Sequence, residues 1–269
     1  MSAQNQEELG RGPVLRPLEC WSLIWAAEVA ARLGAPEAVL MASRRGARLF
    51  SANDLWSPAW WISTTIRRPE AAGGHAAIAP PAAIVRALRG ACALRGRGGT
   101  LLSYGAGAFH VVGPAAATEV HGRIIQFRAG SAIPVSEDEE LDVDAEDLAA
   151  EARLHYLELA GTVNAMVAVT SPPRAVELRL VRSPGLLSEW WLEVAGDGLA
   201  RRLPVEVRML PERDAVVGRY PAAMLNALLS IPIWNDIAVE FAGPADLPAL
   251  RVRWEERNRR TEFQLAPLG

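Results

Sequence analysis

Apolar residues recur at helical spacing near the start of the chain and then fall into runs of strand length. The spacing predicts a helix over 20–33, with Gly34 as its C-terminal cap. The apolar positions of this helix are Leu23, Ala27, Ala30 and Ala31. Apolar runs over 38–42, 47–53 and 60–66 then predict three strands.

A second helix is predicted from the prolines at 80 and 81 to about residue 93, because proline is tolerated in the first turn of a helix. Strands are predicted over 100–104, 108–113 and 118–127. An acidic run that begins at Glu137 then suggests a linker. The predicted organisation is a first domain over 13–127, a connecting loop over 128–140 and a second domain over 141–267.

The order of elements then begins again. A strand over 141–143 and a helix over 145–160 are predicted, the helix from the stripe of Leu148, Ala152 and Leu159 and from Gly161 as its stop. Further strands are predicted over 165–170, 175–182, 189–194, 203–210 and 215–218, and a short helix over 221–229 precedes strands over 237–241, 249–255 and 261–265. This order, repeated after about 125 residues, indicates a duplicated α+β unit with antiparallel sheets and helices on one face.

Composition excludes several classes of protein. The two cysteines are too few for a disulfide framework and lack metal-ligand spacing, so we expect reduced thiols, no metal and no cofactor. The glycines at 96, 98 and 99 cannot form a Walker loop, since the chain has no lysine. No apolar run reaches the roughly 20 residues that span a bilayer, so no membrane partner is expected.

Charge divides unevenly between the two halves of the chain. Residues 1–134 carry 14 arginines against 8 acidic residues, whereas 135–269 carry 14 against 23. Such asymmetry is typical of a surface that meets an anionic partner on one side. Unequal solvated faces explain it equally well.

Several short motifs occur in an order that points to one family. The last third contains Arg219-Tyr220 before a short helix, an Ile-Ala-Val-Glu-Phe strand, Leu247-Pro248, and the ending Glu-Phe-Gln-Leu-Ala-Pro267. The first third contains Gly46-Ala-Arg-Leu-Phe-Ser-Ala-Asn-Asp54. Together they resemble the DNA polymerase sliding clamps of the proliferating cell nuclear antigen (PCNA) family, of the archaeal and eukaryotic type. Ala52, Pro221 and the nine tryptophans depart from that family's pattern.

The resemblance implies an α+β protomer of two similar clamp domains, each with antiparallel sheets and two helices, that assembles into a ring around duplex DNA. It assigns the helices to the lumen, and the expected DNA-binding residues are Arg32, Arg86, Arg89, Arg95, Arg97, Arg153 and Arg219. The first helix departs from the family, since Trp25 and Ala26 stand where a basic pair is usual.

The resemblance also implies partners. DNA polymerase, clamp loader and other clients would insert short hydrophobic peptides into a groove lined by Ala52, Ile133, Pro134, Val135, Leu265, Ala266 and Pro267. Neighbouring subunits of a homo- or heterotrimer would meet through strands 118–127 and 189–194, with Ile124, Trp190, Trp191 and Leu192 at the interface. An unpaired strand edge needs such a partner.

Two other functions stay open. A checkpoint-type clamp shares the fold and differs at the client groove. An enzyme is the alternative from another class, but the four histidines lie far apart and there is no Gly-x-Ser-x-Gly nucleophile motif, so we expect no catalysis. A clamp would act in the cytoplasm beside the nucleoid, or in the nucleus of a eukaryote.

Overall fold

The chain folds into two compact units. The computed structural model describes residues 12–43, 46–54, 59–66, 74–92, 99–105, 107–114, 116–127, 148–169, 173–183, 189–209, 211, 215–230, 233 and 235–269. The first unit comprises residues 1–57, 61–136 and 256–261, and the second comprises 58–60, 137–255 and 262–269. The predicted connecting loop, 128–140, lies outside the described residues.

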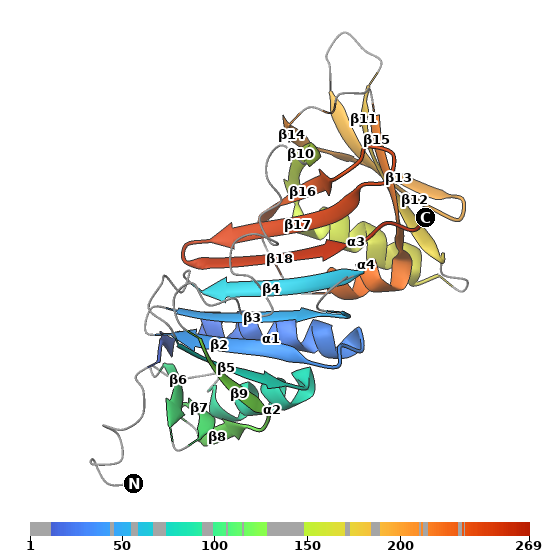
Figure 1. The fold of residues 1–269 in the computed structure, drawn as a ribbon. Coiled ribbons are helices and arrows are strands. Elements are labelled where there is room, and N and C mark those ends of the chain that lie inside the picture. The colour runs from blue at the N-terminus through green and yellow to red at the C-terminus, as the bar shows by residue number, and fades with distance from the viewer. Residues whose placement is uncertain are drawn as a thin grey trace. The chain divides into compact units, whose positions relative to one another are not determined.

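The first unit contains two helices and two groups of strands (Figure 1). Its elements are β1 (Val14–Leu15), α1 (Pro17–Arg32), β2 (Ala38–Ser43), β3 (Gly46–Ala52), β4 (Trp60–Ile66), β5 (Gly74–Ala79), α2 (Pro81–Ala91), β6 (Thr100–Gly105), β7 (Ala108–Val112), β8 (Ala117–Val120) and β9 (Arg123–Phe127). The strands pair in the orders β4-β3-β2-β5-β9 and β1-β6-β7-β8. Helix α1 packs on β3, and α2 packs on α1, β7 and β8.

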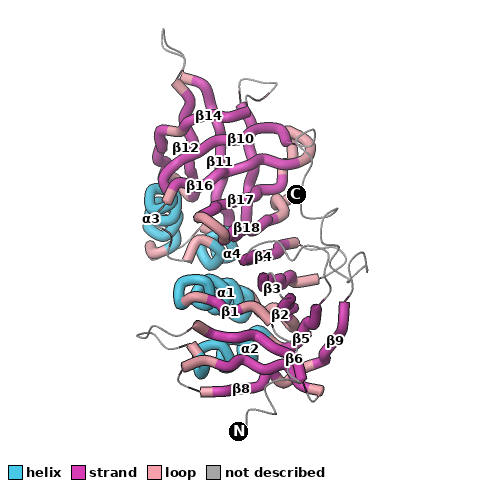
Figure 2. The backbone as a smooth tube through the Cα atoms, turned by 90° about the vertical axis from the view of Figure 1, so that its left-hand side faces the viewer, coloured by secondary structure: helices cyan, strands magenta, loops and turns pink. Residues whose placement is uncertain are grey.

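The second unit repeats this plan (Figure 2). Its elements are β10 (Leu148–His155), α3 (Tyr156–Val167), β11 (Ala175–Arg182), β12 (Trp190–Gly196), β13 (Leu199–Pro204), β14 (Glu206–Met209), β15 (Ala215–Pro221), α4 (Ala222–Leu228), β16 (Asp236–Ala242), β17 (Ala249–Glu256) and β18 (Arg259–Leu265). The orders are β13-β12-β11-β15 and β14-β10-β16-β17-β18. Helices α3 and α4 pack on each other, and α4 also packs on β11 and β15.

The sheet orders confirm the predicted duplication. The series β4-β3-β2-β5 in the first unit corresponds strand by strand to β13-β12-β11-β15 in the second, and β1-β6-β7-β8 corresponds to β10-β16-β17-β18. In each unit the first helix follows the first strand. The second helix lies between β5 and β6 in the first unit and between the corresponding β15 and β16 in the second. The α+β class and the antiparallel pairing are likewise confirmed.

The prediction of a helix over 145–160 is wrong for residues 148–155 and correct for 156–160. Residues 148–155 form β10, in which Ala150, Ala152 and Leu154 alternate into the core and pair with β16. The helix begins only at Tyr156 and continues through Gly161 to Val167, so the strand predicted over 165–170 is wrong as well. Alanine, leucine and glutamate favour helix, but sheet pairing overrides that preference here.

The single strand predicted over 118–127 is in fact two strands in different sheets. Strand β8 pairs with β7, and β9 pairs with β5. The break falls at Gly122, where an added Cβ would lie 2.4 Å from the carbonyl oxygen of Ile78. Strand β5 itself was not predicted, and the strand predicted over 203–210 is divided between β13 and β14.

The two cysteines are paired, which contradicts the expectation of reduced thiols. Cys20 of α1 and Cys92, directly after α2, form a disulfide with their Cα atoms 6.8 Å apart. Both side chains are buried. The bond therefore fixes the end of α2 beside the start of α1.

Candidate nucleic-acid and partner interface

The helices of the first unit carry the exposed cations expected for phosphate contacts. Arg86 and Arg89 are exposed on α2, and Arg32 is exposed as the last residue of α1. Arg89 forms an ion pair with Glu28 of α1, which joins the two helices across their exposed surface. Such cations hold a phosphate backbone without reading its sequence.

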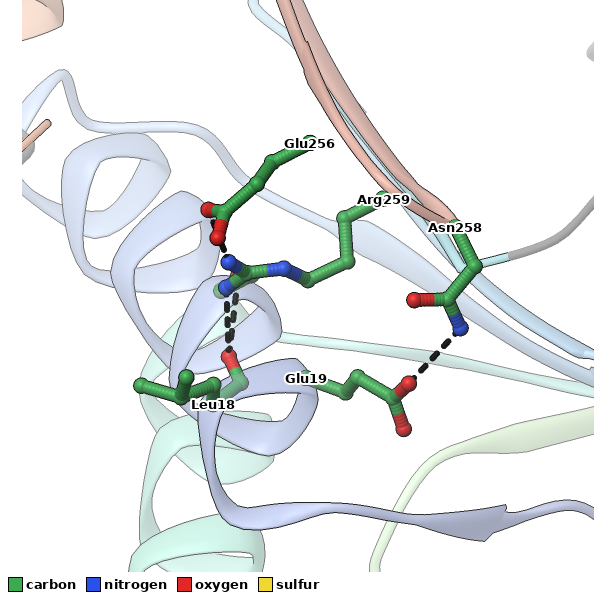
Figure 3. A network of polar contacts seen from close by, with 6 residues as sticks. Leu18, Glu19, Glu256, Asn258 and Arg259 are labelled. Atoms are coloured by element: carbon green, nitrogen blue, oxygen red, sulfur yellow. Dashed lines mark hydrogen bonds and ion pairs between the residues drawn. The ribbon is translucent and has the colours of Figure 1, made fainter. Parts of the chain in front are cut away.

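The tip of the β17–β18 hairpin fixes the orientation of α1 (Figure 3). Arg259 donates to the carbonyl oxygen of Leu18 over 3.2 Å and to the hydroxyl of Ser22 over 3.0 Å. Asn258 donates to the Glu19 carboxylate over 2.7 Å. These bonds hold one side of α1 against the hairpin and leave the side that carries Leu18 and Arg32 exposed.

Two of the other predicted DNA-binding residues, Arg153 and Arg219, lie on strands and not on these helices. Arg153 lies on β10, 3.9 Å from Glu151, so its expected place on a helix is wrong. Arg219 lies on β15 opposite Glu177 of β11, shortly before α4. Helices α3 and α4 contain no arginine. Arg95 and Arg97 lie outside the described residues.

Part of the predicted client groove lies at the end of the chain, where backbone hydrogen bonds hold it. Leu265 is buried at the end of β18, the N–H of Ala266 donates to Ala59 O over 2.7 Å, and the N–H of Leu268 donates to Arg219 O over 2.7 Å. Pro267 is partly buried. Ala52 is buried on β3 in the first unit, and Ile133, Pro134 and Val135 lie outside the described residues. The groove itself stays a prediction.

Two of the motifs on which the family resemblance rested are in contact. The Tyr220 hydroxyl donates to the carbonyl oxygen of Pro248 over 2.9 Å in the core of the second unit. Burial raises the pKa of this hydroxyl, so it stays protonated and keeps the bond. The Arg-Tyr and Leu-Pro pairs therefore form one structural contact.

The predicted interface strand at 189–194 is not an edge. Strand β12 pairs with β11 on one side and β13 on the other, and Leu192 is buried in the core. Trp190 and Trp191 lie at its start, so the expectation that they belong to an unpaired strand is wrong. Ile124, partly buried, lies on β9, which pairs only with β5 among the described strands of its unit.

Strand β8, which falls within the interface strand predicted over 118–127, lies at a sheet edge, and so does β13, which was not predicted at the interface. Strand β13 ends the order β13-β12-β11-β15, and β8 ends β1-β6-β7-β8. Glu119 of β8 and Arg202 of β13 are both exposed. Each lies next to buried residues, Val120 and Leu203, and therefore on the opposite face of its strand. Sequence alone could not show this, because edge position depends on sheet order.

A buried ionic cluster lies in the second unit. Arg251 Nη2 lies 3.0 Å from Glu262 and Nε lies 3.5 Å from Glu240, and Arg253 reaches Glu240 over 2.8 Å. Burial raises the pKa of Glu240, against the opposing effect of the two arginines.

Within the described ranges, no group of histidine, cysteine or acidic residues is arranged to hold a metal ion. The helices of that part are also too short or too polar to cross a membrane.

Comparisons with known proteins address the arrangement as a whole. No family model and no curated protein matches the sequence. Among solved structures, PCNA from Thermococcus kodakaraensis is 15% identical, covers 91% of this chain and 96% of its own, and has a TM-score of 0.56. A structure of A. fulgidus PCNA with the C-terminal region of FEN-1 is 12% identical, covers 97% and 98%, and has a TM-score of 0.64. The chain has the sliding-clamp fold. The two repeated units are thus the two clamp domains, and the similarity extends over nearly the whole chain.

Proposed function

We propose that this chain is a sliding-clamp subunit that encloses duplex DNA and tethers other proteins to it without catalysis. The observation that carries the proposal is the duplicated clamp unit, which matches PCNA structures over 91–97% of this chain. A closed ring is linked to DNA by topology. Weak phosphate attraction is then sufficient, and the ring can slide.

The DNA-facing surface in this proposal is the α1–α2 layer of the first unit. Arg32, Arg86 and Arg89 supply its cations, and Arg95 and Arg97 follow α2 in the sequence. Because α3 and α4 carry no arginine, attraction to the duplex is concentrated on the first unit. Phosphate contacts of this kind weaken steeply with added salt.

Assembly in this proposal is head-to-tail through β8 of one copy and β13 of the next. Glu119 and Arg202 offer opposite charges at these edges, each on the strand face away from the buried neighbour. A heterologous contact, in which two different surfaces of successive copies meet, generates a ring when the rotation closes. We propose three copies, and a mixed ring would need paralogues with the same pair of edges.

Client proteins would bind as short hydrophobic peptides beside the C-terminal segment. The similar A. fulgidus structure contains the C-terminal region of FEN-1 bound to PCNA. Here Leu265, Ala266 and Pro267, with Ala52 and residues 133–135, are proposed to receive DNA polymerase, the clamp loader and other clients. Since Leu265 is buried, residues 266–269 are the accessible part of this segment.

The test is retention on linear DNA whose ends can be blocked. The DNA is a duplex with biotin at both ends, and streptavidin is added to it either before or after the labelled protein. The DNA is then washed at high salt to remove protein that is bound only electrostatically. A clamp stays only when the ends are blocked after loading. Equal loss in both orders would contradict an enclosing ring.

A further inference from the structure

The exposed face of α1 carries aromatic residues where phosphate-binding cations were expected. Leu18 is 61% exposed, and Trp21 and Trp25 are partly exposed on the same side of the helix. The two indole rings are in contact, with centroids 6.0 Å apart and planes tilted by 39°. Arg32 continues this face about two turns after Trp25.

The aromatic face is bordered by cations on both sides. On one side α2 packs against α1 and exposes Arg86 and Arg89, the latter paired with Glu28. On the other side Arg259 lies against Leu18 and Ser22. The indoles therefore lie between guanidinium groups, of which Arg89 is paired with Glu28 and Arg259 with Glu256.

This face cannot turn inward to bury the tryptophans. Leu23, Ala27 and Ala30 already fill the core side of α1. The disulfide of Cys20 fixes this end of the helix. The bond from Asn258 to Glu19 holds the same end (Figure 3). The indoles are therefore held at the surface before any partner arrives.

We infer that this face binds single-stranded DNA, with unpaired bases stacked on Trp21 and Trp25 and phosphates attracted by Arg86 and Arg89. The inference rests on the proposed function, because it assumes that the α1–α2 layer meets DNA. Paired bases hide their faces inside the duplex, so duplex DNA would use the arginines and leave the indoles unused. Base stacking on aromatic side chains strengthens binding whatever the base sequence, because every base has a π-face. A purely apolar partner would instead leave the flanking arginines unused.

The experiment measures fluorescence anisotropy of labelled oligo(dT) and of a labelled duplex over a series of salt concentrations. Replacing both tryptophans by Ala should weaken oligo(dT) binding about 10-fold or more and change duplex binding little. Trp21→Phe with Trp25→Phe should restore most of the loss. Arg86→Ala with Arg89→Ala should weaken both ligands and flatten the salt dependence.

Leu157→Ala supplies the matched control, since Leu157 is an exposed apolar residue on α3 of the other unit and should change neither affinity. If the Ala pair fails to fold, Trp21→Gln with Trp25→Gln replaces it, with the same expectations. Unchanged oligo(dT) binding would overturn the inference, as would equal loss of duplex binding. A difference in molar mass between the Ala variant and the parent would also overturn the inference, because it would show that copies of the chain meet at this face of α1. A tryptophan variant that is still trapped on end-blocked duplex separates this failure from failure of the proposed function.

Discussion

Single residues of the second unit place charge where water does not reach. Arg251 and Glu240 are each 1% exposed and Glu262 is 4% exposed, on three adjacent strands of one sheet. Removing charges from water is costly unless partners compensate, and Arg251 lies between the two carboxylates for this reason. The raised pKa of Glu240 shows that burial outweighs its arginine partners.

Glu240→Gln should therefore change how stability depends on pH. With its pKa raised in the folded state, Glu240 favours folding fully below the ordinary carboxyl pKa, and this contribution is lost as pH rises through the raised value. We expect the stability of the variant relative to the parent to increase across that window. Denaturant unfolding from about pH 4 to pH 8 measures it.

Glu206→Gln is the control, because Glu206 is exposed on β14 and pairs with an exposed arginine. Its profile should run parallel to that of the parent. If the Glu240→Gln and parent profiles are also parallel, burial of this carboxylate does not govern its protonation.

The disulfide gives a second prediction at this scale. Cys20 and Cys92 are 72 residues apart. Closing a loop of that length lowers the entropy of the unfolded chain and so raises the free energy of unfolding by about 4 kcal/mol. Cys20→Ala should lower the free energy of unfolding by about that amount under oxidising conditions. Adding reductant should bring the parent to the level of the variant. A parent that unfolds at the same denaturant concentration with and without reductant would contradict the bond's contribution.

Secondary-structure elements differ in how far sequence predicts them. The helix at 17–32 and the strands at 38–66 were predicted because apolar spacing and turn residues agree there. The sequence of β10 predicts a helix, because its alanines and glutamates favour helix and only pairing with β14 and β16 makes it a strand. Strand β5 was missed because its glycine and alanines give a weak strand signal.

The candidate site likewise has residues that the sequence places correctly and features that it does not predict. Arg86 and Arg89 were placed correctly on a helix, because the second helix is strongly amphipathic in sequence. The edge position of β13, the inner position of β12 and the pairing of the cysteines depend on sheet order and helix packing. No local pattern along the chain contains that information.

The β8 and β13 edges yield a charge-exchange prediction. Glu119→Arg or Arg202→Glu alone places like charges at the proposed contact and should raise the dissociation constant of assembly about fivefold, for roughly 1 kcal/mol. Both changes in one chain should restore assembly. Sedimentation over a dilution series measures it.

Arg201→Glu is the matched control, because Arg201 is exposed on the same strand but lies on the other face. It should change assembly less than Arg202→Glu does. A double variant that stays as weak as either single variant would remove this pair from the interface.

At the scale of the whole molecule, the strand order of one unit is repeated in the other. The two units share a strand order that sequence predicted only as an order of elements, because residue identity between them is negligible. In the first unit β4 ends the series that β13 ends in the second, and β13 has no outer partner among the described strands of its unit. A repeated unit with an open edge at one end and a complementary edge at the other is suited to head-to-tail assembly.

The molar mass of the purified chain in solution tests this claim most directly. Multi-angle light scattering during size-exclusion chromatography gives that mass without assuming a shape. Because the chain has a mass of 29.0 kDa, the account predicts a species of three copies, about 87 kDa, that dissociates on dilution. A mass of 29.0 kDa at every concentration would contradict a ring built from copies of this chain.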